Sequence, residues 1–248
     1  MNKYGLIGFP LIHSFSAQYF SEKFFREGIS DSLYDLYPID NINKFPVLVN
    51  DNNNLRGLSV TIPYKQAVIP FLYSLDNIAK QVGAVNTIKI IKGENVLLKG
   101  YNTDVFGFEE SLKPLLKEHH NKALILGTGG ASKAVAYVLK KLGINFLFVS
   151  RSNFNSASVI TYEELNRDII SSHLLIINAS PAGMFPHIGE SPAIPYDYLT
   201  KEHLLYDLVY NPAETMFMKK GTEKGAVVTN GLQMLYLQAE KAWQIWND

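Results

Sequence analysis

A glycine-rich turn with the sequence GTGGAS occupies residues 127–132. It follows a short apolar run at 123–126 and precedes a segment, 133–142, whose apolar residues recur at helical spacing. Such a turn before a helix can hold a pyrophosphate, because the free N–H groups of the first helical turn point at the anion. The pattern predicts a dinucleotide site, although small residues at a strand-to-helix turn also serve tight packing. The expected contacts are Gly127, Thr128, Gly129, Gly130 and Ala131, with Ser132 as the small residue that permits close helix packing.

The strand expected after this helix, 145–149, ends in the tripeptide Ser150-Arg151-Ser152. An NAD enzyme normally places an Asp or Glu at this point to bind the adenosine ribose, whereas the next acidic residue here is Glu163. A guanidinium pairs with phosphate oxygens, and serine hydroxyls complete the shell around a 2′-phosphate. The tripeptide therefore favours NADP over NAD, with a solvated loop arginine as the alternative.

The glycine turn lies far from the start of the chain, since 126 residues precede it. A separate domain must come first, and substrate chemistry is expected there. Its strand-like runs at 4–9, 33–37 and 55–61 alternate with a helical pattern at 17–27. A hairpin is expected across 85–101, which adds an antiparallel element to a mostly parallel sheet.

After the turn, the second domain continues with a helix at 161–170 and strand-like runs at 174–177 and 204–209. In an open parallel sheet, ligands bind beyond the carboxyl ends of the strands. Several prolines predict an irregular loop between 180 and 201. The segments beyond the strands, 178–180, 207–211 and 229–231, are therefore expected to face the cofactor, with Ala179, Leu208 and Gly231 as contacts.

The composition is that of a chain that can bury a sizeable core, with 248 residues of which 47% are hydrophobic. The formal net charge is zero, so nothing favours nucleic acid or an anionic membrane as a partner. The absence of cysteine excludes disulfides and a cysteine nucleophile. Residues 1–10 show no targeting pattern and no apolar run reaches bilayer-spanning length, so a cytoplasmic location is expected. No histidines have metal-ligand spacing; no metal is expected, and His13 is interpreted as structural.

Several polar strings carry a resemblance to a known family. In the first domain they are HSFS at 13–16, SVTIPYK at 59–65, GAVNT at 83–87 and NTD at 102–104. In the second they are NASPAGM at 178–184, YDLVYNP at 206–212 and NGLQML at 230–235. Together with the glycine turn, and in this order, they make the chain resemble shikimate dehydrogenases over nearly its whole length.

The resemblance implies NADP-linked interconversion of 3-dehydroshikimate and shikimate, with Lys65 and Asp104 as the catalytic pair. It implies an α/β fold with a mixed-sheet substrate domain at 1–103 and a Rossmann-like NADP-binding domain at 104–230. The C-terminal helix would return to the substrate domain and complete it with residues 231–248. The implied substrate-binding residues are Ser14, Ser16, Thr61, Asn86, Tyr210 and Gln238, with the two serines at the substrate carboxylate.

The implied chemistry is consistent with these residue types. A ketone that accepts a hydride develops negative charge on oxygen, so the Lys65 ammonium can polarise the carbonyl and then supply the proton. Asp104 would fix the lysine and a neighbouring hydroxyl. The alternatives are a surface lysine at a helix start and an aspartate N-cap, and we expect Asp104 to serve as both cap and catalytic group.

The chain departs from the family pattern at Ala17, Ser59 and Val105, where proline, asparagine and glycine are usual. These departures leave finer substrate preference open but remove no catalytic group. A quinate/shikimate dehydrogenase that uses NAD is one alternative; a non-catalytic NADP-responsive binding protein is another, against which the presence of both Lys65 and Asp104 argues. Two pairs, Tyr19/Lys23 and Tyr137/Lys141, match the Tyr-x-x-x-Lys spacing of short-chain dehydrogenases and are interpreted as coincidences. A monomer or homodimer is expected.

Overall fold

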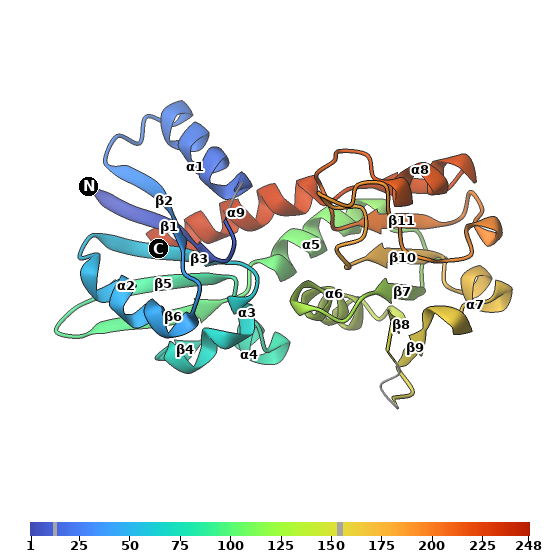
Figure 1. The fold of residues 1–248 in the computed structure, drawn as a ribbon, viewed down its shortest axis with the longest axis horizontal. Coiled ribbons are helices and arrows are strands. Elements are labelled where there is room, and N and C mark those ends of the chain that lie inside the picture. Colours follow the sequence, from blue (N-terminus) through green and yellow to red (C-terminus); the bar gives the residue numbers. More distant parts are fainter. Residues whose placement is uncertain (12–13, 153–155) are drawn as a thin grey trace. The chain divides into compact units, whose positions relative to one another are not determined.

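The structure is a computed structural model that describes residues 1–11, 14–152 and 156–248. It divides into two compact units (Figure 1). Unit 1 comprises Met1–Thr103 and Gln238–Asp248, and unit 2 comprises Asp104–Leu237. The sequence places the return to the first domain at residue 231, whereas the structure assigns the last helix to unit 1 only from Gln238 onward. That helix is continuous across the division, so no turn or proline marks the position in the sequence.

Unit 1 is built on a six-stranded mixed sheet with the strand order β2-β1-β3-β5-β6-β4. β1 pairs in parallel with β2 and β3, whereas β5 pairs antiparallel with β3 and β6. The predicted hairpin is the β5–β6 pair, so the prediction of a parallel sheet with an antiparallel element is confirmed. The strands are β1 (Asn2–Gly8), β2 (Ser32–Pro38), β3 (Leu55–Val60), β4 (Ser74–Leu75), β5 (Thr87–Lys92) and β6 (Val96–Tyr101).

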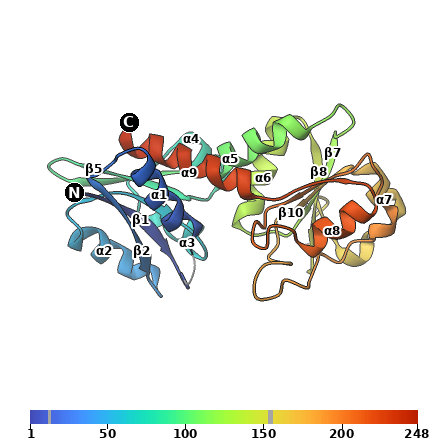
Figure 2. The ribbon, with the colours of Figure 1, turned by 90° about the horizontal axis from the view of Figure 1, so that it is seen from above.

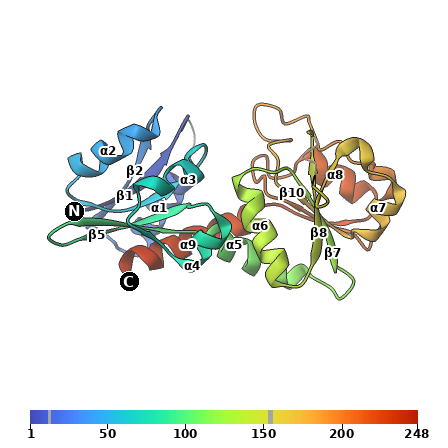
Figure 3. The same cartoon turned by 90° about the horizontal axis from the view of Figure 1, so that it is seen from below.

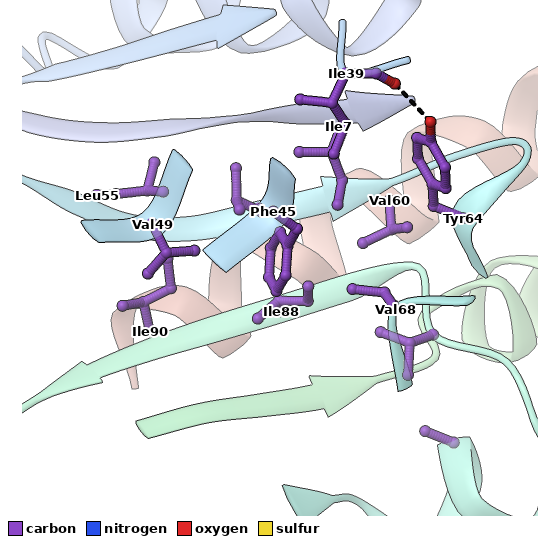
Figure 4. Close-up of a cluster of buried hydrophobic side chains, with 13 residues drawn as sticks. Ile7, Ile39, Phe45, Val49, Leu55, Val60, Tyr64, Val68, Ile88 and Ile90 are labelled. Carbon is purple, nitrogen blue, oxygen red and sulfur yellow. Dashed lines mark hydrogen bonds between the residues drawn. The ribbon is translucent and has the colours of Figure 1, made fainter. Parts of the chain in front are cut away.

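Helices cover both faces of this sheet (Figures 1 and 2). Tyr4 and Leu6 of β1 pack with α1 and α9, whereas Ile7 packs on the opposite face, as the two-residue period of a strand requires. Figure 4 shows that opposite face, where Ile7 lies near Phe45 of α2 and the Tyr64 hydroxyl donates to the Ile39 carbonyl oxygen at 2.6 Å. The helices are α1 (Phe15–Arg26), α2 (Phe45–Asp51), α3 (Tyr64–Ala67), α4 (Asn77–Val82) and the end of α9 (Leu232–Asn247).

Close packing of α9 on the sheet depends on a glycine. A Cβ on Gly57 of β3 would lie 2.3 Å from the Trp246 indole, whose Nε1–H donates to the Ile88 carbonyl oxygen at 3.0 Å. The indole thus occupies the space that any other residue at position 57 would fill. The C-terminal helix is fixed against unit 1 by this contact.

Unit 2 contains a six-stranded sheet in which every pairing is parallel, with the strand order β12-β11-β10-β7-β8-β9. Counted along the chain from β7, this is the order 6-5-4-1-2-3 of a doubly wound Rossmann sheet, as predicted. The strand order reverses between β7 and β10. The strands are β7 (Lys122–Leu126), β8 (Asn145–Ser150), β9 (Val159–Thr161), β10 (Leu175–Asn178), β11 (Leu204–Asp207) and β12 (Val227–Thr229).

The helices of unit 2 also lie on both faces of their sheet, with α6 on one side and α7 and α8 on the other (Figure 3). The core on the second side joins Leu124 and Ile176 of the sheet to Ile170 of α7 and Phe217 of α8. The helices are α5 (Asp104–Leu112), α6 (Gly130–Lys141), α7 (Arg167–Ser172) and α8 (Met216–Glu223). Short 3-10 turns occur at Ile42–Lys44, Ile69–Phe71, Lys113–Leu115, Tyr162–Glu164 and Tyr196–Tyr198.

The prediction of a helix over 161–170 is wrong for the first half of that segment. Thr161 ends β9 and forms a capping box with Glu164 around a single 3-10 turn. The Asn166 side chain then accepts from the Ile169 N–H at 3.0 Å and starts α7 at Arg167. Two caps in succession divide what reads as one amphipathic segment. In the described parts of the chain, no helix is both long and apolar enough to cross a membrane.

Candidate active site

The glycine turn lies where the strand order of unit 2 reverses, between β7 and β10. Gly127 has a φ of 109°, and a Cβ there would lie 3.2 Å from the Ala179 carbonyl oxygen, so both the turn and the packing against the segment after β10 favour glycine. A Cβ on Gly129 would meet no described atom within 4 Å, which leaves its backbone open to a ligand. The turn thus exposes the N-terminus of α6 at the edge where such sheets bind dinucleotides.

Ser132 takes the third small position of the turn. It is buried, and its hydroxyl donates to the Gly129 carbonyl oxygen at 2.6 Å. This bond closes the first turn of α6 from inside. The side chain therefore supports the turn, as the spacing predicts for a small packing residue.

The predicted 2′-phosphate group follows β8. Arg151 is exposed, whereas Ser150 is buried and its Oγ accepts from the Ser152 N–H at 3.2 Å. Burial raises the pKa of Tyr162, and the charge of Arg151 lowers it in part, so the guanidinium lies near that ring. The arrangement presents a cation next to a backbone turn, which suits a phosphate.

The predicted carboxylate-binding serines lie at the start of α1. Ser14 is the N-cap, and its Oγ accepts from the Ala17 N–H at 3.3 Å. Ser16 is in the first helical turn, and its hydroxyl, together with that of Ser59, partly offsets the rise that burial causes in the pKa of Tyr34. Both serines thus lie at a helix N-terminus, where an anion is favoured. His13, interpreted as structural, lies outside the described residues.

A buried polar cluster in unit 1 connects distant parts of the sequence. The Asn86 Oδ1 accepts from the Thr103 N–H at 2.7 Å and from the Thr87 hydroxyl at 3.1 Å. The Asn86 Nδ2 donates to the Thr103 Oγ1 at 3.0 Å and to the Gln238 Oε1 at 3.4 Å. Two predicted substrate residues, Asn86 and Gln238, therefore come together although 152 positions separate them.

Two residues of that cluster, Thr87 and Thr103, were not among the predicted site residues. Both are almost fully buried, and their hydroxyls contact each other at 3.2 Å. Their signal in the sequence was the threonine that follows Asn86 in GAVNT and the threonine that precedes Asp104 in NTD. Thr103 also fixes the backbone immediately before Asp104 through its bond to Asn86.

The two predicted catalytic residues belong to different units. Lys65 lies in α3 of unit 1, and its carbonyl oxygen accepts from the Val85 N–H at 2.7 Å. Thr61 precedes it, with its N–H bonded to the Ile7 carbonyl oxygen at 3.0 Å. Asp104 is buried and is the first residue of α5, so it lies inside the helix start and not at the capping position. A carboxylate in a first helical turn is favoured by the helix dipole.

The remaining predicted residues of unit 2 follow β11 and β12. Leu208 and Tyr210 are partly buried, and burial raises the pKa of the Tyr210 hydroxyl. Gly231 is buried, and its position excludes any side chain because a Cβ would lie 2.4 Å from the Leu208 carbonyl oxygen. The segments after β11 and β12 are thus in direct contact.

Both Tyr-x-x-x-Lys pairs contain a lysine in an ion pair. Tyr19 and Lys23 both donate to the Glu240 carboxylate, and Lys141 pairs with Glu109 at 2.8 Å. Each lysine is thus paired with a carboxylate of its own unit. Over the described residues, no group of three or more His, Cys, Asp or Glu side chains is placed to hold a metal ion.

Comparison with known proteins agrees with the fold and with these motifs. Residues 6–88 match the family model described as shikimate dehydrogenase substrate binding domain. Shikimate dehydrogenase (NADP(+)) of Carboxydothermus hydrogenoformans is 37% identical, over 98% of this chain and 90% of that protein.

Two solved structures extend the comparison. A chorismate mutase/shikimate 5-dehydrogenase fusion protein from Clostridium acetobutylicum is 35% identical with a TM-score of 0.87, over 100% of this chain and 92% of that one. Quinate dehydrogenase from Corynebacterium glutamicum, in complex with NAD, is 27% identical with a TM-score of 0.85. The match covers 99% of this chain and 93% of that one. On its two-unit fold, its motifs and these identities, the chain belongs to the shikimate dehydrogenase family.

Proposed function

We propose that this protein catalyses the reversible NADPH-linked reduction of 3-dehydroshikimate to shikimate, a step toward the aromatic amino acids. The observation that carries the proposal is the buried cluster that joins Asn86 to Gln238, because it assembles two expected ring-binding groups from opposite ends of the chain. Membership of the family and the name of the 37% identical relative support the same reaction.

In this proposal, NADPH supplies a hydride to the carbonyl carbon when it is bound. The Lys65 ammonium donates a hydrogen bond to the carbonyl oxygen and then transfers its proton there as that oxygen gains charge. The Asp104 carboxylate would orient the lysine and a neighbouring substrate hydroxyl. In the reverse direction the Lys65 side chain would accept the proton of the substrate hydroxyl.

Substrate binding is assigned to the polar residues of unit 1 and to Tyr210. Ser14 and Ser16 would bind the substrate carboxylate at the N-terminus of α1, where the helix dipole favours an anion. Thr61, Asn86 and Gln238 would bind the ring hydroxyls. The Asn86 amide donates to the Gln238 Oε1 at 3.4 Å, so these two proposed ring-binding side chains lie side by side.

Cofactor binding is assigned to the glycine turn and to the segments after β8, β10, β11 and β12. The pyrophosphate would meet the backbone N–H groups at the start of α6, and Arg151 with its two flanking serines would bind the 2′-phosphate. The residues are Gly127, Thr128, Gly129, Gly130, Ala131, Ser150, Arg151, Ser152, Ala179, Leu208 and Gly231. A cytoplasmic location and a monomeric or homodimeric state complete the proposal.

The test follows NADPH absorbance after 3-dehydroshikimate is added to the purified protein. Rapid oxidation that NADH does not support at a comparable rate is the expected result. Quinate oxidation with NAD at an efficiency similar to that of shikimate oxidation with NADP would instead assign a quinate/shikimate dehydrogenase. NADPH binding without turnover of any of these substrates would assign a non-catalytic binding protein.

A further inference from the structure

Three fully buried polar side chains lie at the carboxyl ends of β10 and β11. Asn178 ends β10 and Asp207 ends β11, and both side chains, like that of Thr215, have no solvent exposure. The Asp207 Oδ1 accepts from the Asn178 Nδ2 at 2.9 Å, and its Oδ2 accepts from the Thr215 hydroxyl at 2.6 Å. The two neighbouring strands are thus cross-linked by side chains at the edge where the cofactor is expected.

Asp207 is held by neutral hydrogen-bond donors. Within the described ranges its carboxylate forms no ion pair, and burial raises its pKa to about 6, an effect that its donors Thr215, Val209 and Asn178 only partly offset. A carboxylate in such surroundings is costly unless its lone pairs are satisfied. A fully satisfied buried network of this kind makes the local backbone rigid.

The network fixes the backbone of the two segments that follow the strands. Asp207 Oδ1 accepts from the Val209 N–H at 3.0 Å, and the Asn178 carbonyl oxygen accepts from the Leu208 N–H at 2.9 Å. On the other strand, Asn178 Oδ1 accepts from the Ser180 N–H at 3.1 Å and from its hydroxyl at 2.6 Å. The bonds therefore bracket Ala179 and Leu208, two of the proposed cofactor contacts.

Strand order shows which half of a dinucleotide these segments would meet. The pyrophosphate turn follows β7, and the 2′-phosphate group follows β8 on one side of it. β10 and β11 lie on the other side of β7. A dinucleotide that crosses the switch point with its adenosine over β8 places its nicotinamide half beyond β10 and β11.

We infer that Asp207 is a positioning residue for the nicotinamide half of the cofactor, acting through the backbone of Ala179 and Leu208. It has no exposed surface and so acts without touching the ligand. The inference deepens the proposed function and rests on it. The Thr215 hydroxyl belongs to the same network: it donates to Asp207, accepts from the Met218 N–H at 3.3 Å and so caps α8.

The test compares two ligands by calorimetry below the melting temperature. NADPH reaches both halves of the site, whereas adenosine 2′,5′-bisphosphate reaches the adenosine half alone. Asp207→Asn and Thr215→Val should each raise the Kd of NADPH about tenfold, because each removes one buried hydrogen bond to a charged group. The Kd of the bisphosphate should stay unchanged. Thr215→Ser keeps the hydroxyl and is expected to bind NADPH as the unchanged protein does.

A cap control separates positioning from stability. Asn166→Ala removes the N-cap bond of α7 in the same unit and should lower the melting temperature without changing either Kd. Equal weakening of both ligands, or an unchanged Kd for NADPH in folded Thr215→Val and Asp207→Asn, would overturn the positioning role while leaving the proposed function intact. If the unchanged protein binds the bisphosphate but not NADPH, the proposed function fails, and this assignment fails with it.

Discussion

Lys65 is the residue on which the proposed chemistry depends most. Its ammonium is the assigned proton donor, and positioned proton transfer typically contributes ~10²–10⁴-fold to a rate. We predict that Lys65→Ala lowers kcat on that scale while NADPH binding and the melting temperature are retained. Asp104→Asn should lower kcat and also raise the KM of shikimate, because a carboxylate acceptor is lost.

Steady-state kinetics in both directions provide the measurement for this pair. Lys80→Ala is the matched control, since Lys80 is an exposed lysine on α4 of the same unit. It should behave as the unchanged protein. Wild-type turnover by a folded Lys65→Ala protein at saturating substrate would show that Lys65 is at most a binding residue.

Arg151 carries the proposed preference between cofactors. Its exposed guanidinium follows β8, and loss of a phosphate pair removes roughly 1.5–3 kcal/mol from NADP binding. We predict that Arg151→Ala raises the KM of NADP by about 10- to 100-fold at fixed ionic strength and changes that of NAD little. The ratio of kcat/KM values with the two cofactors is the measurement; an unchanged ratio would contradict the assignment.

At the scale of elements, an ion pair fixes α1 against α9. Lys23 of α1 has a side chain only 5% exposed and lies 2.9 Å from the Glu240 carboxylate of α9, which also accepts from the Tyr19 hydroxyl. Two positions before Glu240 in the same helix is Gln238, which bonds to Asn86. The Lys23–Glu240 ion pair therefore joins the helix that carries Gln238 to the helix that begins at the two serines.

Removal of Glu240 should destabilise unit 1, because Lys23 would lose one of its two carboxylate partners and Tyr19 would lose its hydrogen bond to Glu240. We predict that Glu240→Ala lowers the free energy of unfolding by ~1–3 kcal/mol and that Glu240→Gln, which keeps an acceptor, lowers it less. Both tryptophans, Trp243 and Trp246, lie on this helix, so their fluorescence during urea unfolding reports on it. Gln244→Ala, an exposed change on the same helix, should have no effect.

At the scale of the whole molecule, buried titratable groups set how stability depends on pH. The Nδ1 atoms of His120 and His203 accept from the N–H groups of Lys117 and Thr200, each at 3.0 Å, which suits only the neutral ring. Burial lowers the pKa of both histidines. As pH falls below ~6.5 the unfolded chain binds protons that the folded chain does not, so stability present above that pH is lost.

Asp207 has the opposite effect on the pH dependence. Burial raises the pKa of its carboxyl from 3.8 to about 6, so the folded protein takes up this proton before the unfolded chain does. Its contribution to the free energy of unfolding therefore becomes more favourable as pH falls through about 6. The histidines and this carboxyl therefore change the free energy of unfolding in opposite directions over the same pH range.

Two variants separate these contributions. His203→Gln keeps an acceptor and a donor but removes the titrating ring. Its free energy of unfolding should therefore fall less between about pH 7.5 and 5.5 than that of the unchanged protein, with a difference in slope of up to ~1.4 kcal/mol per pH unit. Asp207→Asn should lose more, because its proton uptake is gone. Urea unfolding at the two pH values is the measurement, and equal pH dependence in all three proteins would contradict both assignments.

Much of the fold could be predicted because its signals are local. The helix of 17–27, the hairpin around 92–95 and the glycine turn depend on residues within about ten positions of each other, and α1, β5–β6 and the start of α6 lie there. The prediction of one helix over 161–170 is wrong because successive caps, at Thr161 and Asn166, start two separate helical turns there. The roles of the candidate site residues stay predictions until the variants are measured.

The sequence by itself determined the family, the order of the motifs and the α/β class, since these reside in short strings and in periodicity. Only the tertiary structure decided which distant residues meet. Asn86 meets Gln238, Lys23 meets Glu240 and Asn178 meets Asp207. The physical reason is that a buried polar group must find a partner, and the partner is chosen by strand order and helix packing, not by distance along the chain.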